Sequence, residues 1–446
     1  MNIWNIIIKQ HGKDTFDVEI PSAEMKLIIN TGQHDEQISM LSSNVFKELK
    51  QNNLILNTNV SDLLHLALGI YTADQVVSRS EQGFQGWSRH FKLYVPVSAL
   101  KEWNYSGEKL ADILSFLSGD KWEIFFRKNE MSVTRKLELF ANPIPKNIRK
   151  VSLFSGGLDS FIGAVDLLEN KQKVAFVSHY KRGSEGGVQT KLYAKLKEKY
   201  GDESFVQYQF YVQPNQHHKN ATKEASSRAR SFLFMCLGIS VANSLDEHAD
   251  FIIPENGLIS LNVPLTGTRL GSHSTRTTHP YYLKIFKEII AGIGIKNAVL
   301  NPYQFRTKGE MMIDCKNQLV LKNLGPETLS CSHSENSRYA GLSPGIHCGY
   351  CVPCIIRQAA ENKSKIFSSK YVYEILKSPP PQTMKSGSDI RAFKLALERI
   401  KDKPKQSLLF DVLSSGPVPT DNYEIFEKYI DTYERGMKEV EAFLRK

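Results

Sequence analysis

The sequence has no long hydrophobic run and no segment with the pattern of a secretory signal. Its first eight residues are mostly apolar, but the chain turns polar at Lys9 and has neither a basic start nor a small-residue cleavage site. The longest apolar stretch, residues 232–245, is interrupted by one glycine and three polar residues. A membrane-spanning helix needs about 18 or more apolar residues in succession. We therefore expect a cytoplasmic protein with no membrane partner.

Cysteine is scarce, with six residues in 446. Because the cytosolic glutathione pool keeps thiols reduced, we expect these six to be metal ligands, core residues or catalysts and not disulfides. The net charge of +10 is modest and includes no basic tract, which fits an anionic ligand such as a nucleotide as readily as nucleic acid. Hydrophobic residues make up 41% and charged residues 23% of the chain, and these ordinary values exclude a mainly disordered or collagen-like protein.

The length of 446 residues predicts about three domains. We expect an accessory or partner-recognition domain at residues 1–145, a central domain at residues 146–376 and a small helical C-terminal extension at residues 377–446. Prolines mark both boundaries, because Pro143 and Pro145 interrupt regular structure at the first and residues 379–381 are three successive prolines at the second.

Hydrophobic periodicity indicates the fold class of each domain. In the first domain, alternating runs at residues 91–97 and 122–126 occur beside helical periodicity at residues 110–117, which predicts an α+β domain. The central domain alternates apolar runs with amphipathic segments. Its strands are expected at residues 151–154, 174–177 and 251–253, and its helices at residues 161–169, 190–200 and 229–245. This βαβ rhythm predicts an α/β fold with a doubly wound parallel sheet. The extension should contain helices at residues 389–402 and 422–446.

The most informative stretch is a loop with two glycines between an expected strand and an expected helix. It consists of Ser155, Gly156, Gly157, Leu158, Asp159 and Ser160. Glycines let the backbone turn sharply and bring N–H groups against phosphate oxygens, and the following helix adds free N–H groups and the positive end of its dipole. The serine hydroxyls are further donors. Asp159 would repel phosphate but can hold a Mg²⁺ ion that bridges phosphates, so we expect a metal–nucleotide complex.

This loop matches neither of two common nucleotide-binding patterns. It lacks the Gly-Lys-Ser/Thr ending of a Walker A sequence and the Gly-x-Gly-x-x-Gly of a dinucleotide fold. The sequence Ser-Gly-Gly-Leu-Asp-Ser resembles the PP-loop of ATP pyrophosphatases, which cleave ATP between the α and β phosphates and activate their substrate as an adenylate. The resemblance implies ATP and Mg²⁺ as cofactors. The alternative is an ordinary strand-to-helix turn, in which glycine provides the bend and Asp or Ser caps the helix.

Four of the six cysteines have the spacing of a zinc site. They are Cys331, Cys348, Cys351 and Cys354. Thiolates at this spacing can converge on one Zn²⁺ ion, and four sulfur ligands leave no open position for water, so we expect a structural site. The alternatives are an iron–sulfur cluster, a redox dithiol, and a site in which His347 replaces Cys331. Cys236 and Cys315 have apolar neighbours in the sequence and are expected in the core.

The phosphate loop, followed by the segment His-Cys-Gly-Tyr-Cys-Val-Pro-Cys-Ile-Ile-Arg at residues 347–357, resembles the 7-cyano-7-deazaguanine synthase (QueC) family. The resemblance covers residues from about 149 to about 365. That family uses ATP to adenylate the carboxylate of 7-carboxy-7-deazaguanine, forms an amide with ammonia, and dehydrates the amide in a second ATP-dependent step. The likeness implies that Lys308 faces phosphate and that Arg228 meets the nucleotide. For both residues the alternative is a solvated basic side chain.

The chain departs from that family in its length and in its substrate segment. Long additions precede the loop and follow the cysteine cluster. Such extended chains resemble the QueC-like components of bacterial anti-phage defence systems of the Qat type, which implies transfer of the activated carboxylate to a protein amine instead of ammonia. Four polar residues suit a carboxylated purine-like ring and its developing adenylate, namely Asn256, Arg269, Arg276 and His279. A surface loop rich in Ser and Thr is the alternative.

Together the residues and the resemblance predict an ATP-dependent carbon–nitrogen ligase. Its partners would be a 7-carboxy-7-deazaguanine-like small molecule and a protein encoded nearby, without a need for nucleic acid. The expected catalytic residues are Asp159, Ser160, Lys308 and Arg228, which would act by placement and charge neutralisation. The alternatives are a synthase that uses ammonia in queuosine-type nucleoside biosynthesis, a tRNA-thiolating enzyme that needs a free thiol, and a zinc-containing nucleic-acid-binding protein with an inactive loop.

Overall fold

The computed structural model describes residues 2–32, 40–129, 147–215, 224, 226–266, 276–380, 385–420 and 422–446. These residues form two compact units, each assembled from separate segments of the chain. The first unit comprises Met1–Val151, Tyr208–Phe251 and Tyr282–Val299, and the second comprises Ser152–Gln207, Ile252–Tyr281 and Leu300–Lys446. This grouping differs from three consecutive domains, because parts of the expected central domain belong to the first unit and the C-terminal extension belongs to the second. The expected first boundary, at residues 141–146, lies outside the described residues.

The first unit contains a four-stranded sheet. Its strands are β1 (Ile3–Lys9), β2 (Met25–Asn30), β4 (His90–Val97) and β5 (Lys121–Lys128), in the order β2-β1-β4-β5. All three neighbouring pairs are parallel. Parallel strands need crossover connections, and helices between β2 and β4 and between β4 and β5 supply two of them. This part of the chain is therefore α/β, and the expected α+β class is wrong.

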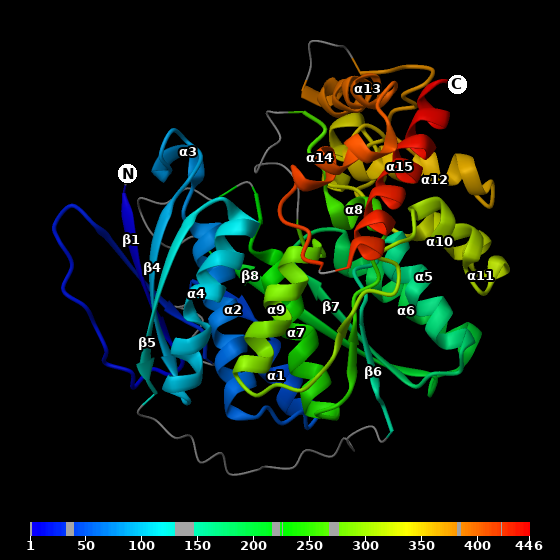
Figure 1. Ribbon diagram of the computed structural model, residues 1–446. Helices are drawn as coiled ribbons and strands as arrows, with labels where there is room; N and C mark the ends of the chain where they lie inside the picture. Colours follow the sequence, from blue (N-terminus) through cyan, green and yellow to red (C-terminus); the bar gives the residue numbers. More distant parts are fainter. Residues whose placement is uncertain are drawn as a thin grey trace. The chain divides into compact units, whose positions relative to one another are not determined.

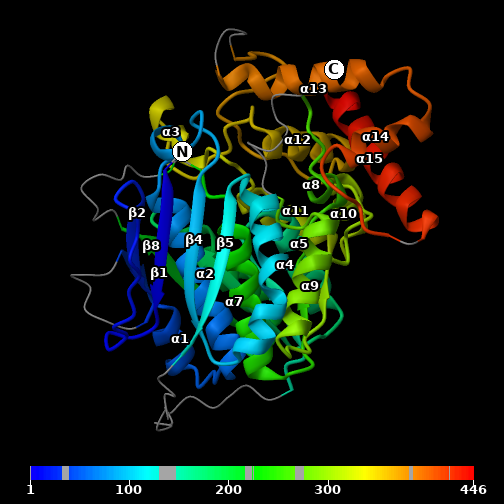
Figure 2. The same ribbon diagram turned by 60° about the vertical axis from the view of Figure 1, so that its left-hand side comes forward.

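Helices cover one face of this sheet (Figures 1 and 2). The helices assigned to the first unit are α1 (Val45–Gln51), α2 (Thr58–Val76), α3 (Arg79–Gln82), α4 (Leu100–Ser118), α7 (Arg230–Leu245) and most of α9 (Pro280–Gly292). Helix α2 contacts both the sheet and α7, and nearly all of its residues after Asn59 are buried. Gly69 makes the close approach possible, since a Cβ there would lie 2.4 Å from Cδ1 of Ile8.

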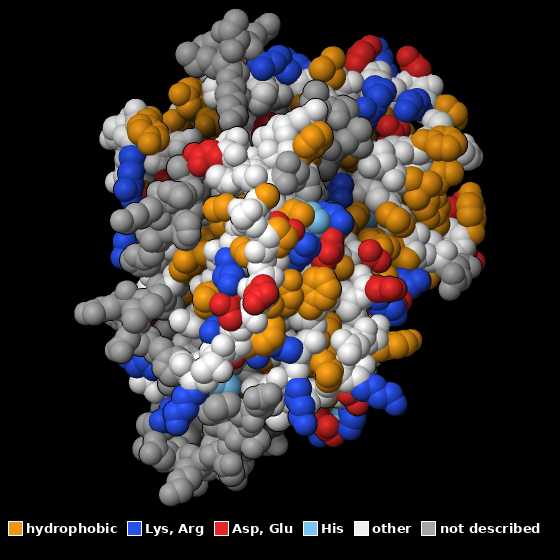
Figure 3. Space-filling model, turned by 90° about the vertical axis from the view of Figure 1, so that its left-hand side faces the viewer, with side chains coloured by type: hydrophobic (Ala, Val, Ile, Leu, Met, Phe, Trp, Pro, Cys, Tyr) orange, Lys and Arg blue, Asp and Glu red, His pale blue; other side chains and the backbone are white. Residues whose placement is uncertain are grey.

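The segment between β1 and β2 contributes to the other face of the sheet. Phe16 lies 6.2 Å from Tyr94, whose ring stacks on Phe125 at 5.2 Å between centroids, and the Arg127 guanidinium lies 4.3 Å from the Phe16 ring centroid. Figure 3 shows this side of the molecule, where hydrophobic side chains are intermixed with charged ones over the described surface. Among the described residues of the first unit, this aromatic row and not a helix covers that face (Figure 2).

A second sheet has six strands. They are β3 (Leu41–Ser43), β6 (Lys150–Leu153), β7 (Val174–Tyr180), β8 (Phe205–Pro214), β9 (Asp250–Ile252) and β10 (Val299–Leu300), in the order β10-β9-β6-β7-β8-β3. Strand β3 pairs with β8 in the antiparallel direction. The strands expected at residues 151–154, 174–177 and 251–253 are confirmed as β6, β7 and β9. Chain order reverses between β6 and β9, and in α/β sheets such a reversal marks the edge at which ligands bind.

The second unit is mainly helical outside its strands. Its helices are α5 (Leu158–Glu169), α6 (Glu185–Tyr200), α8 (Gly257–Leu261), α10 (Lys308–Asp314), α11 (Gln318–Leu324), α12 (Val352–Ser364), α13 (Ser388–Ile400), α14 (Leu408–Leu413) and α15 (Tyr423–Leu444), with short 3₁₀ turns η2 (Gly325–Glu327), η3 (Ser334–Ala340), η4 (Lys385–Gly387) and η5 (Lys405–Ser407). The helices expected at residues 161–169, 190–200, 229–245, 389–402 and 422–446 are confirmed as α5, α6, α7, α13 and α15.

The C-terminal helices pack onto α8 and α12 within the second unit. Leu258, Ile355, Phe393 and Val440 belong to one buried apolar cluster, to which α8, α12, α13 and α15 contribute. Gly436 of α15 lies so close to α8 that a Cβ there would be 2.9 Å from Cδ2 of Leu258. The extension is thus a part of the core of the second unit and not a separate domain.

Candidate functional site

The loop between β6 and α5 has the strand–loop–helix arrangement expected from the sequence. Gly156 has φ of +83°, a left-handed conformation that glycine adopts without strain, and Gly157 precedes the first residue of α5. Ser155 Oγ and Ser160 Oγ lie 3.2 Å apart. Gly157 N donates to Ser155 Oγ at 3.3 Å, and Ser160 Oγ donates to the Gly157 carbonyl at 2.9 Å. Hydroxyl groups and a backbone amide therefore converge at the start of α5.

A distant segment, residues 329–330, completes this loop. Leu329 N donates to the Gly156 carbonyl at 2.8 Å, and Ser330 Oγ accepts the Leu158 N–H at 3.0 Å. One of the N–H groups that begin a helix is thus paired with a hydroxyl from a segment 172 residues away. Ser330 was not predicted from the sequence, in which only its position directly before Cys331 distinguishes it.

Asp159 lies in the first turn of α5 and is buried. Its Oδ2 accepts hydrogen bonds from Asn256 N at 3.2 Å and from Asn256 Nδ2 at 2.6 Å, and its Oδ1 pairs with Lys308 Nζ. A carboxylate has about four lone-pair directions. Three donors leave it room for about one further ligand, so a Mg²⁺ ion held by Asp159 stays a prediction.

Glu255 adds a second carboxyl group next to this ion pair. Burial and the neighbouring Asp159 carboxylate raise its pKa, and Lys308 opposes the shift. Its backbone is held by Asn301, whose Nδ2 donates to the Glu255 carbonyl at 2.9 Å. The raised pKa favours a protonated Glu255 beside the charged Asp159–Lys308 pair. Sequence reasoning missed Glu255, although it directly precedes Asn256.

Lys308 is the first residue of α10 and is buried, which rules out the solvated side chain considered as an alternative. Thr307 caps the helix, with its hydroxyl accepting Glu310 N–H at 3.1 Å and its own N–H donating to Glu310 Oε2 at 3.0 Å. This capping box fixes where α10 begins. The structure therefore brings Lys308, Asp159 and the phosphate loop together, although Lys308 and Asp159 are 149 residues apart.

Asn256 and His279, both expected to bind substrate, make hydrogen bonds to the protein itself. Asn256 caps α8 through Ile259 N at 3.1 Å while its amide holds Asp159. His279 is buried, its Nδ1 accepts the Tyr281 N–H at 3.2 Å, and its Nε2 lies 3.0 Å from Ser415 Oγ. Burial, with a smaller effect of Arg276, lowers the pKa of His279 to about 3. The imidazole is therefore neutral at pH 7.

The three expected arginines lie in different surroundings. Arg228 belongs to the first unit, where it donates to the Ser118 carbonyl at 2.7 Å and lies 5.0 Å from the Trp87 ring centroid. Burial and neighbouring Arg79 lower its pKa to about 10. Arg276 is half-buried in the second unit, and burial lowers its pKa. Arg269 lies outside the described residues. The nucleotide role of Arg228 and the substrate roles of Arg269 and Arg276 stay predictions.

The four cysteines expected to bind zinc come together as one group. All of their sulfur atoms lie within 4.8 Å of one another, with Cys331 and Cys351 4.0 Å apart and Cys348 and Cys354 3.9 Å apart. A tetrahedral site with Zn–S bonds of about 2.3 Å needs sulfur separations of about 3.8 Å. These two separations are close to that value, so the group could hold a Zn²⁺ ion.

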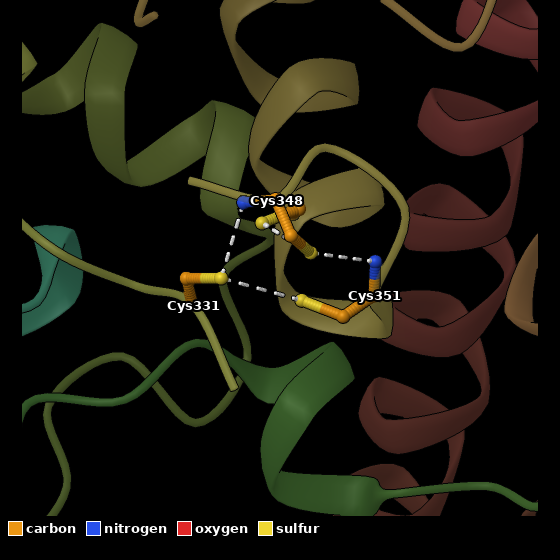
Figure 4. A group of neighbouring side chains, drawn as sticks. Cys331, Cys348 and Cys351 are labelled. Carbon is orange, nitrogen blue, oxygen red and sulfur yellow. Dashed lines mark hydrogen bonds between the residues drawn. The ribbon is translucent and has the colours of Figure 1, made fainter. Parts of the chain in front are cut away.

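Figure 4 shows three of these cysteines turned toward one another. Cys348 N donates to Cys331 Sγ at 3.3 Å, and Cys351 N donates to Cys348 Sγ at 3.4 Å. Such N–H donors favour thiolates, the form that binds metal. His347 does not replace Cys331, because its Nε2 accepts the Ser330 N–H at 3.2 Å while the Cys331 sulfur belongs to the group.

The remaining two cysteines are buried, as expected. Burial raises the pKa of Cys236 well above its usual range and that of Cys315 to about 12. A thiol reacts as its thiolate, so neither is suited to nucleophilic catalysis. This disfavours the thiolating alternative, which needs a reactive thiol.

No family model matches the chain, and no curated protein matches it. Among the described residues, no helix has the length and apolarity that crossing a bilayer requires.

The chemistry open to the site follows from its geometry. Amides and hydroxyls at the start of α5 can bind an anion with several oxygens, and the buried ammonium of Lys308, paired with the first turn of that helix, can neutralise further negative charge.

Proposed function

We propose that this chain is an ATP-dependent adenylating ligase, which activates a carboxylate and transfers it to an amine. One observation carries the proposal: the phosphate loop and the buried Asp159–Lys308 pair meet at the start of a single helix, α5. Anion binding at a helix N-terminus uses N–H groups and hydroxyls, and the Ser155–Ser160 loop brings two hydroxyls and the Gly157 N–H together at the start of α5. Lys308, which pairs with Asp159 in the first turn of α5, adds a buried cation, and a cation of this kind can neutralise the charge that develops on a transferring phosphate.

In the proposed reaction the carboxylate oxygen attacks the α phosphorus of ATP, the bond between the α and β phosphates breaks, and pyrophosphate leaves. An amine then attacks the acyl carbon of the adenylate, and AMP leaves. Ser155, Ser160 and the loop amides would hold the departing pyrophosphate. Lys308, paired with Asp159 in the structure, would then interact in part with phosphate. Mg²⁺, held in part by Asp159, would supply additional charge neutralisation. No protein nucleophile is needed.

The substrate class follows from the sequence resemblance to the QueC family. We propose a 7-carboxy-7-deazaguanine-like acid as substrate and, by likeness to the Qat-type defence components, an amine on a partner protein as acceptor. The reversal of strand order between β6 and β9 supports a PP-loop type of doubly wound sheet, because the Ser155 loop follows β6 and the Glu255–Asn256 segment follows β9. Closed four-sulfur ligation supports a structural role for zinc.

An exchange assay tests this proposal. Purified protein is incubated with ATP, labelled pyrophosphate and 7-carboxy-7-deazaguanine, and we expect label to enter ATP only when the acid is present. Lys308→Met should lower the exchange rate at least about 100-fold, as loss of a group that stabilises transition-state charge does. Lys322→Met, an exposed lysine of α11, is the matched control and should exchange at the wild-type rate. Absence of acid-dependent exchange in a folded, zinc-loaded sample refutes the proposal.

A further inference from the structure

Helix α15, near the end of the chain, is bound to the first turn of α10 through a buried carboxylate. Glu439 accepts hydrogen bonds from Thr307 Oγ1, from Gly309 N at 3.2 Å and from Lys363 Nζ at 2.8 Å. Thr307 and Gly309 are the residues on either side of Lys308. Glu439 therefore holds the residues on both sides of the lysine that pairs with Asp159, Thr307 through its side chain and Gly309 through its backbone.

A second side chain of α15 holds the same turn. Arg435 precedes Glu439 by four residues, which places both on one face of the helix. Arg435 Nε donates to Glu310 Oε1 at 2.7 Å, and its Nη2 donates to the Phe305 carbonyl at 2.9 Å. Burial alone would raise the pKa of Glu310, but the hydrogen bonds from Arg435 and Thr307 N outweigh it and lower the pKa. The carboxylate that completes the capping box is thus kept ionised by α15.

Close packing leaves this turn little freedom to move. A Cβ built on Gly309 would lie 2.9 Å from both carboxylate oxygens of Glu439 and 2.8 Å from Cδ of Lys363. Gly257 of α8 meets α15 in the same way, since a Cβ there would lie 2.5 Å from Cγ2 of Thr432. The Glu439 carboxylate and the α10 backbone are consequently in direct contact, with no side chain between them.

We propose that Glu439 is a positioning residue that fixes Lys308 against Asp159, so that the C-terminal helix completes the candidate site. Its consequence for nucleotide binding rests on the proposed function, but the positioning itself does not. The extension that begins near residue 377 then has a role in the candidate site itself. Its last helix acts on the phosphate-facing lysine from within the same unit, and a separate docking role is not needed to account for it.

Chemical labelling of lysine tests the positioning directly. Folded protein is exposed briefly to an acylating reagent, and modification of Lys308 is measured by mass spectrometry relative to the exposed Lys322. The buried, ion-paired Lys308 of the wild type should react slowly. Glu439→Ala should raise its rate at least about tenfold, the change expected when hydrogen bonds to a charged group are lost. Glu434→Ala is the control, because Glu434 lies on α15 but pairs only along its own helix with Lys438 in the described contacts.

Glu439→Gln keeps the shape of the side chain and guards against a variant that fails to fold. We expect it to melt near the wild-type temperature and still to label Lys308 faster, which a general loosening of the fold would not produce. Labelling of Lys308 at the wild-type rate in both folded variants overturns the proposal. An ATP titration separates the two claims: a wild type that binds no ATP refutes the proposed function, while the labelling result still decides the role of Glu439.

Discussion

Replacing Asp159 by alanine is expected to destabilise the second unit strongly as well as to abolish ATP turnover. Asp159 and Lys308 are both buried, with side chains 7% and 5% exposed. Removing the carboxylate leaves the ammonium without its partner in a place that water does not reach. Breaking a buried ion pair in this way costs about 3 to 5 kcal/mol of unfolding free energy.

Glu255 sets where in that range the loss should fall. Asp159 is one of two causes that raise the Glu255 pKa, so its removal lowers that pKa and allows Glu255 to ionise and compensate Lys308. We therefore expect about 3 kcal/mol for Asp159→Ala and nearer 5 kcal/mol when Glu255→Gln is added. Asp159→Ala with Lys308→Met removes both charges and leaves only the two Asn256 donors unpaired, so it should cost about 1 to 3 kcal/mol.

Urea unfolding followed by circular dichroism measures these differences, and hydrogen exchange of α5 peptides assigns them to the second unit. Tryptophan fluorescence reports the first unit separately, because all four tryptophans lie there. Asp314→Ala is the control: its pair with Arg306 is more than half exposed, and its loss should cost less than about 1 kcal/mol. The reasoning is refuted if Asp159→Ala is as stable as this control, or if the charge-free double variant is less stable than the single one.

Three further predictions concern other parts of the chain. The pKa of His279 falls from 6.5 to about 3 on folding, so between these pH values the unfolded chain binds a proton that the folded chain does not. The free energy of unfolding should therefore drop by about 2 kcal/mol from pH 7 to pH 5. Urea titrations of His279→Gln should show a correspondingly weaker pH dependence. Elemental analysis should find about one zinc per chain, and Cys351→Ser should lose it. Zinc removal should also weaken ATP binding measured by calorimetry, because Cys331 follows Ser330 and Ser330 pairs with α5. Deleting residues 2–146 should give insoluble protein in a sedimentation assay, since α7 would lose the α2 surface on which it packs; a soluble monomer would contradict this.

The parts of the fold that the sequence predicts correctly are those with a strong local pattern. The loop at residues 155–160 has its glycines, hydroxyls and helix start within six positions, so a short stretch of sequence contains the whole signal. The four cysteines are likewise recognisable from spacing alone, because thiolates have few other uses in such a cluster. Pairing direction is different. Strand patterns in residues 91–97 and 122–126 say where strands lie but not that β4 and β5 run parallel.

The contacts that define the site were not predictable because they join residues far apart in the chain. The sequence predicts Asp159 as a loop residue that holds Mg²⁺, yet in the structure it is buried and contacts Asn256 and Lys308. Helix α2 was missed for a related reason: it is apolar on nearly every side, so it lacks the amphipathic stripe that marks a surface helix. In both cases tertiary packing decides the environment of a residue, and local periodicity does not contain that information.

Three residues outside the phosphate loop hold it in place. Ser330, which directly precedes Cys331, pairs with the first N–H of α5. Lys308 pairs with Asp159 from the first turn of α10, which Glu439 holds in place. A ligand that binds the loop more tightly when these supports are in place must, by thermodynamic linkage, stabilise the supports in return. Nucleotide should therefore raise the affinity of the cysteine group for zinc and slow the labelling of Lys308, two effects on different segments from one binding event. If the loop bound phosphate independently of its surroundings, neither segment would respond.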